Sequence, residues 1–353
     1  MFERNVKVEH LDERVFFNAL GPEFRSVTIF ASVVGSVAEG LATTTSDTDI
    51  FLVVEDEAVC RLSSMRLRAL EVGGRLIDVV LLGRKEVEDL LGTSADKWKF
   101  LDLRKLEFVH KIIFGCVFFG LPGFRVLTEK FSIEDFLYGM RDRYLRNAND
   151  EFSNLVGYLD DNLLLSAADT ARTYVRSCLD AYLSTLGDCY PQPKWRIQRL
   201  LRNIDRTAPV VDEVLRVEFD APYRDEVLLK GWIESCLRTA RKFQLGVFFG
   251  EGAFSAFEKN SSNSTLDHFF PDRFVVERID GLFVVRVGKS HGGIDSRTAA
   301  ILLSLAWPID NETRAGILKS ELGMEISADG ISLRHQSFIK SKIVKKIASD
   351  QFA

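Results

Sequence analysis

Two aspartates separated by one residue, Asp47 and Asp49, come directly before and at the start of an apolar run that ends at Val54. This run reads as a β-strand, in which side chains at positions i and i+2 lie on the same face. Two carboxylates held on one face repel each other unless a cation compensates their charge. The pair therefore predicts a site for a divalent metal ion.

A third acid, Asp78, interrupts the apolar run of residues 75–82. In a strand it lies on the face opposite to Ile77 and Val79, and an unpaired acid buried there would cost several kcal/mol. A shared metal removes that cost, so Asp78 is a candidate third ligand. The alternative is an acid that is exposed to solvent or paired with Arg75.

Gly35 and Ser36 form a turn between a predicted strand at residues 26–34 and the aspartate pair, and Gly40 follows in the same loop. Glycine lets backbone N–H groups approach phosphate oxygens, and the serine hydroxyl can donate a further hydrogen bond. The alternative for Ser36 is a cap on a following helix. Leu41 and Ala42 stand where a P-loop has Lys-Ser/Thr, which excludes a Walker ATPase.

Together, the Gly35-Ser36 turn, the Asp47-x-Asp49 strand and Asp78 resemble the signature of the DNA polymerase β-like nucleotidyltransferase superfamily. The resemblance implies that Asp47 and Asp49 hold Mg²⁺, with two ions in the complete site, and that Asp78 activates the attacking hydroxyl. It further implies that a nucleoside triphosphate, with ATP as the expected donor, transfers its nucleoside monophosphate (AMP from ATP) to a hydroxyl acceptor while pyrophosphate leaves.

The elements around these residues fit such a catalytic palm. Their predicted order is strand, turn, strand, helix, strand, with the helix at residues 61–72 and the last strand at residues 75–82. Residues 132–246 show helical periodicity almost throughout. We therefore predict an α+β protein with a mixed-sheet palm at residues 1–128, an all-helical domain at 129–258, a linker at 259–266 and a winged-helix-like module at 267–353.

The helical domain carries further candidate residues. Lys194 and Trp195 follow a Pro-x-Pro motif that is similar to one in the helical substrate domains of several nucleotidyltransferases, and they could contact nucleotide or anchor packing. Arg199 recurs at helical spacing with Arg196, Arg202 and Arg206, which gives either a cationic stripe facing an anionic ligand or a solvated helix face. His110 could reach a phosphate or be a helix histidine with an ordinary structural role.

The last module is predicted as a hairpin across Asp280-Gly281 followed by helices at residues 295–306, 311–322 and 337–347. This order loosely resembles the winged-helix peptide-binding domains of pyrroloquinoline quinone biosynthesis, which implies that a peptide could add as a strand to the hairpin edge. The lysines of the last helix would suit RNA or an acidic peptide, and the alternative is a solvated terminal helix.

Composition excludes several classes of protein. The five cysteines are scattered without C-x-x-C spacing, which argues against a disulfide framework or a zinc site. The chain shows no signal-peptide core and no run long enough to span a bilayer, so we expect no membrane partner and a cytoplasmic location. A net charge of −5 argues against a chain-wide nucleic-acid surface.

The leading hypothesis is a nucleotidyltransferase that acts on a small-molecule or peptide acceptor. A second hypothesis is a toxin-like nucleotidyltransferase that modifies a tRNA end or a protein side chain. A third is a noncatalytic antitoxin or scaffold built on the same palm, although a scaffold has no need for three acids together.

Overall fold

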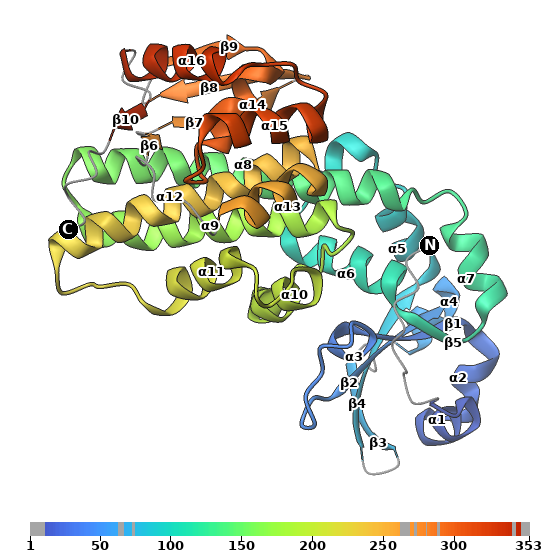
Figure 1. Ribbon diagram of the computed structural model, residues 1–353. Coiled ribbons are helices and arrows are strands. Elements are labelled where there is room, and N and C mark those ends of the chain that lie inside the picture. The colour runs from blue at the N-terminus through green and yellow to red at the C-terminus, as the bar shows by residue number, and fades with distance from the viewer. Residues whose placement is uncertain are drawn as a thin grey trace. The chain divides into compact units, whose positions relative to one another are not determined.

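The computed structural model describes residues 11–62, 67–72, 75–261, 269–271, 274–279, 281–287, 290–340 and 344–346 (Figure 1). It is an α+β structure that contains a mixed sheet, a separate antiparallel sheet and many helices. The chain divides into two compact units, Met1–Gly139 with Cys189–Gln198, and Met140–Asp188 with Arg199–Ala353. No helix within the described ranges has the length and apolar character needed to cross a membrane.

The first unit contains a five-stranded sheet with the strand order β3-β4-β2-β1-β5. Strands β2 and β4 are parallel, and the other neighbours are antiparallel. The strands are β1 (Thr28–Val34), β2 (Thr48–Val54), β3 (Leu67–Val72), β4 (Arg75–Gly83) and β5 (Cys116–Phe119). The helices are α1 (Glu13–Leu20), α2 (Pro22–Val27), α3 (Gly35–Ala38), α4 (Asp56–Arg61), α5 (Arg84–Leu91), η2 (Ala95–Phe100), α6 (Leu103–Phe114), α7 (Leu121–Thr128) and η3 (Pro193–Trp195), with the start of α8 (Ile133–Asp160).

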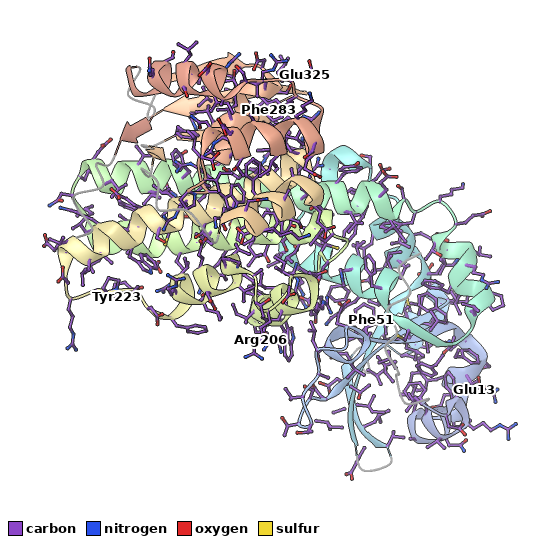
Figure 2. All side chains as sticks on the ribbon, viewed as in Figure 1. Glu13, Phe51, Arg206, Tyr223, Phe283 and Glu325 are labelled. Carbon is purple, nitrogen blue, oxygen red and sulfur yellow. The ribbon has the colours of Figure 1, made fainter. Side chains whose placement is uncertain are left out.

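One face of this sheet forms a hydrophobic core with α1 and α2. Alternate residues of β2 and β4, among them Leu52 and Val79, pack there with Phe16 and Phe24. The opposite face meets α6, where Phe51 of β2, labelled in Figure 2, stacks on Phe108. Because side chains alternate along a strand, the burial of one set of β2 and β4 residues leaves the face of Phe51 for Asp49 and Asp78.

The helix predicted at residues 61–72 is wrong. Residues 67–72 form strand β3, which pairs antiparallel with β4, and the intervening helix is the shorter and earlier α4. Within β3, Leu70 and Val72 are buried whereas Ala69 and Glu71 are exposed. This burial pattern has the period of a strand, and the pairing with β3 satisfies backbone groups along one edge of β4. Sheet pairing therefore overrides the helical prediction for the segment.

The second unit is mainly helical, as predicted for this stretch of the chain. Its two long helices α9 and α12 pack together, and fully buried aromatic side chains such as Tyr182 and Phe243 lie between the helices. The helices are the remainder of α8, α9 (Leu164–Thr185), α10 (Arg196–Asn203), α11 (Pro209–Phe219), α12 (Glu226–Phe249) and α13 (Glu251–Asn260). Of the predicted linker at 259–266, Lys259 and Asn260 belong to α13, and residues 262–266 lie outside the described residues.

The C-terminal part of the second unit contains a three-stranded antiparallel sheet and three helices. The predicted hairpin corresponds to its first two strands, and the side chain of Asp295 caps helix α14. The elements are β6 (Phe269–Pro271), β7 (Phe274–Ile279), β8 (Leu282–Val287), β9 (Ser290–Ile294), α14 (Ser296–Ser304), α15 (Asn311–Leu322), α16 (Ala328–Lys340) and β10 (Val344–Lys346).

The predicted basic helix at residues 337–347 is wrong over its second half. Helix α16 ends at Lys340, and residues 344–346 form strand β10, which pairs antiparallel with β6. Lys345 and Lys346 therefore do not continue a cationic helix face. A third strand, β9, also extends the predicted hairpin because Ser290–Ile294 pairs with β8.

Candidate metal centre

The structure brings Asp47, Asp49 and Asp78 together. Asp49 of β2 lies directly opposite Asp78 of the parallel strand β4, and Asp47 precedes β2 by one residue. One carboxylate oxygen from each of the three aspartates lies within 4.8 Å of the others. This donor set of hard oxygen atoms fits a divalent cation such as Mg²⁺.

Burial and the crowding of the acids alter the proton affinity of Asp49 and Asp78. Burial raises the pKa of Asp49. The positive charge of Lys111 lowers this pKa, and the negative charges of Asp47 and Asp78 raise it further. Burial also raises the pKa of Asp78, together with the charge of Asp47 and a hydrogen bond to it. The cluster therefore needs protons or a cation to offset its negative charge, as a metal centre does.

Gly35 lies against this cluster at the point where β1 enters the short helix α3. Its φ is +69°, which favours glycine, and a Cβ placed on it would collide with Oδ2 of Asp49. Ser36 is half-buried, and its carbonyl oxygen accepts a hydrogen bond from the Leu41 amide at 2.9 Å. Gly40 also has a positive φ, +67°. The loop is therefore tightly folded, and Gly35 fixes its approach to Asp49.

Two residues of α6 complete the surroundings of Asp49, and the sequence analysis did not identify them. Lys111 Nζ lies 3.7 Å from Asp49 Oδ2 and 3.0 Å from Oε1 of Glu107. The signal available in the sequence was their i,i+4 spacing, which places both side chains on one helix face. Such spacing is common on solvated helices, so it could not single out this pair.

His110 has a structural position, which favours the second of its two predicted roles. It is buried, its Nε2 lies 3.6 Å from Oε1 of the buried Glu39, and its ring stacks on Phe114. The ring of Tyr190 also packs against His110, tilted by 41° and with the centroids 5.1 Å apart. Because Glu39 directly follows α3, this contact links the glycine loop to α6.

Lys194 and Trp195 belong to the η3 turn in the first unit. Lys194 is exposed, and its Nζ lies 5.4 Å from the centroid of the Trp195 ring. Both residues fit the cationic and aromatic character expected of a nucleotide contact. Their role in nucleotide binding stays a prediction.

The burial of Arg199 contradicts the predicted cationic stripe. Arg199 belongs to the second unit and is only 1% exposed, and its guanidinium bonds to the carboxylates of Asp180 and Asp188 at 2.9 and 3.0 Å. Burial by itself lowers the pKa of Arg199, but the charges of Asp180 and Asp188 bring it above its ordinary value. The guanidinium is therefore occupied by carboxylates inside the second unit, which argues against its predicted role in binding the nucleotide. Arg202 also pairs with Asp188, and both Arg202 and Arg206, the latter labelled in Figure 2, are exposed.

We predict that Gly35→Ala disrupts the centre. The added methyl group collides with Asp49 and strains a left-handed backbone, so we expect a loss of about 1–3 kcal/mol in the free energy of unfolding. Urea unfolding measures this loss, and a Mn²⁺ titration should show weaker metal binding.

Gly157→Ala provides the matched control for this substitution. Gly157 lies inside α8 with nothing within 4 Å of an added Cβ, so alanine there should stabilise the protein by about 0.5–1 kcal/mol. Equal stability and equal Mn²⁺ affinity of Gly35→Ala and the wild type would contradict the tight approach of Gly35 to Asp49.

We also predict that Mg²⁺ stabilises the protein more strongly as the pH rises. The folded state raises the pKa of Asp49 and Asp78 above the ordinary value of 3.8, so it retains protons that the unfolded chain has released. The stability that protonated Asp49 and Asp78 contribute to the folded state is therefore lost as the pH rises from 3.8 through their raised pKa values. Mg²⁺ binds the deprotonated acids, so its stabilising effect grows over the same range.

Thermal unfolding with Mg²⁺ and with EDTA, from about pH 4 to pH 7, measures this difference. The double variant Asp49→Asn with Asp78→Asn should show a flat difference in Tm. A wild-type difference that does not change with pH would contradict the assignment of these two acids as ligands.

No protein-family model matches the chain, and no curated protein sequence matches it. The functional conclusion therefore depends on the sequence motif and on the geometry of the acids.

Proposed function

We propose that this protein is a metal-dependent nucleotidyltransferase whose first unit is a palm of the DNA polymerase β-like type. The observation that carries the proposal is the meeting of Asp49 of β2, Asp78 of β4 and Asp47, which directly precedes β2, beside Gly35. The left-handed backbone conformation of Gly35 favours glycine. The mixed sheet, with its parallel β2–β4 pair, supports the same reading.

In this reaction the acceptor hydroxyl oxygen bonds to the α-phosphorus of the nucleoside triphosphate, and the bond from that phosphorus to the bridging oxygen of the pyrophosphate breaks. Bound Mg²⁺ would supply charge neutralisation at the attacking and leaving oxygens. Asp47 and Asp49 would hold the metal. Asp78, whose raised pKa suits a proton acceptor, would contribute a ligand and take the proton of the hydroxyl. Gly35 and Ser36 would offer backbone and hydroxyl donors to the phosphate chain.

We propose ATP as the donor and a hydroxyl of a small molecule or a peptide as the acceptor. The RNA alternative depended on the stripe of four arginines in and after α10 and on the basic helix predicted at residues 337–347, of whose described residues only 337–340 are helical, as part of α16. The burial of Arg199 and the pairing of Arg202 with Asp188 remove two of those four cations from a free basic surface. The described structure thus weakens the case for an RNA acceptor.

Pyrophosphate release tests the proposal. Purified protein is incubated with Mg²⁺ and each of the four nucleoside triphosphates, together with panels of hydroxyl-bearing small molecules and peptides. The expected result is release that depends on Mg²⁺, favours one nucleotide and is accompanied by a nucleotide-modified product. Asp89→Asn, an exposed acid of the same unit, serves as the control and should retain activity. Release that EDTA does not abolish would count against the proposal.

A further inference from the structure

Lys111 lies at the junction of the acids and the glycine turn. Its Nζ is 3.7 Å from Oδ2 of Asp49. The same Oδ2 is the atom that a side chain at Gly35 would strike. A single carboxylate oxygen therefore lies between the lysine ammonium and the backbone where the phosphate-binding turn begins.

Glu107 restrains Lys111 from within the same helix. Its Oε1 is 3.0 Å from Lys111 Nζ, and the two side chains are only 20% and 16% exposed. Partial burial strengthens this pairing compared with one on an open surface. A lysine ammonium has three donors on a flexible stem, so it can keep Glu107 as a partner while exchanging Asp49 for another anion.

The charge balance of the site calls for such a cation. Asp47, Asp49 and Asp78 form the cluster, and Glu107 lies close enough to raise the pKa of Asp49. A triphosphate is itself strongly anionic and is repelled by these carboxylates unless cations intervene. Lys111 is a cation of the protein already placed between the acids and the turn.

We propose that Lys111 is a triphosphate-binding residue that exchanges its partner when the nucleotide enters. The proposal rests on the proposed function. Before nucleotide binds, Lys111 pairs with Asp49 and Glu107. With metal and nucleotide bound, Asp49 turns to the metal and Lys111 donates a hydrogen bond to a phosphate oxygen near Gly35 and Ser36, while Glu107 keeps the ammonium within reach.

Calorimetric titration of Lys111→Met tests this exchange. The probes are a nonhydrolysable ATP analogue with Mg²⁺, inorganic tripolyphosphate with Mg²⁺, and Mn²⁺ alone. Loss of a charge-assisted hydrogen bond should weaken both triphosphates by roughly tenfold to a hundredfold. Mn²⁺ alone should bind at least as tightly as to the wild type, because a competing cation has been removed from Asp49.

Two further variants sharpen the test. Lys111→Arg keeps the charge and should recover most of the triphosphate affinity. Lys105→Met removes an exposed lysine of the same helix, which pairs only loosely with Asp102 at 3.9 Å, and should bind all three probes as the wild type does. Thermal unfolding of each variant confirms that the comparison is made between folded proteins.

The outcomes separate the two proposals. Unchanged binding of both triphosphates by folded Lys111→Met would overturn the role of Lys111 and leave the proposed function standing. Equal losses for Mn²⁺ and for the triphosphates would also overturn it, because Lys111 would then only support the shape of the site. Failure of the wild type to bind either triphosphate with Mg²⁺ would overturn the role of Lys111 and the proposed function together.

Discussion

Asp49→Asn should reduce the rate of the proposed nucleotide transfer by at least about 10³-fold, because a bound metal would supply several kcal/mol of transition-state stabilisation. Asparagine has nearly the shape of aspartate, so the fold should persist. Removal of one of three crowded carboxylates should even raise the Tm of the metal-free protein, since burial and neighbouring charge disfavour ionised Asp49. Single-turnover rates at saturating Mg²⁺ and thermal unfolding in EDTA measure the two effects.

Opposite changes in activity and stability distinguish a functional acid from a structural one. Replacing an acid with a structural role would lower both the stability and the activity of the protein. Asp89→Asn, on the exposed surface of the first unit, should change neither quantity measurably. A transfer rate of Asp49→Asn within threefold of the wild type would remove Asp49 from the catalytic centre.

Glu258→Ala should destabilise the second unit by about 3–5 kcal/mol, the range for breaking a buried ion pair. Glu258 of α13 is 5% exposed and accepts hydrogen bonds from Lys242 Nζ at 3.0 Å, Trp307 Nε1 at 2.7 Å and the Val210 amide at 3.0 Å. Its removal leaves an indole N–H and a backbone amide buried without acceptors, and leaves Lys242 with only Glu213 as an ionic partner among the bonds described.

Urea unfolding of Glu258→Ala measures this loss through the midpoint and the slope of the transition. The adjacent exposed residue provides the control, and Lys259→Ala should stay within about 0.5 kcal/mol of the wild type. A cost below about 1 kcal/mol for Glu258→Ala would show that the network contributes little to stability.

The sequence predicted the strands that carry the acids because their patterns are local. Alternation in β2 and β4 fixed which face Asp49 and Asp78 occupy, and Gly35 marked the turn between β1 and β2. The ends of the C-terminal helices also depend on local signals. Asp295 precedes and caps α14, and Gly323 ends α15 in a left-handed conformation.

The features that the sequence did not reveal depend on contacts between distant segments. Residues 67–72 form strand β3 because they pair with β4, and residues 344–346 form strand β10 because they pair with β6. Arg199 is buried because Asp180 and Asp188 fold against it, which helical spacing alone could not show. Glu107 and Lys111 enter the site only because α6 covers the face of the sheet that bears Asp49.

The most direct test of the account is the binding of Mn²⁺ to the protein without nucleotide, followed by electron paramagnetic resonance. The account predicts saturable binding by the wild type and by Asp89→Asn, and loss of that binding when Asp47, Asp49 and Asp78 are all replaced by asparagine while the fold persists. Mn²⁺ binding that is the same in the triple variant and in the wild type would contradict the claim that these three acids form a metal centre.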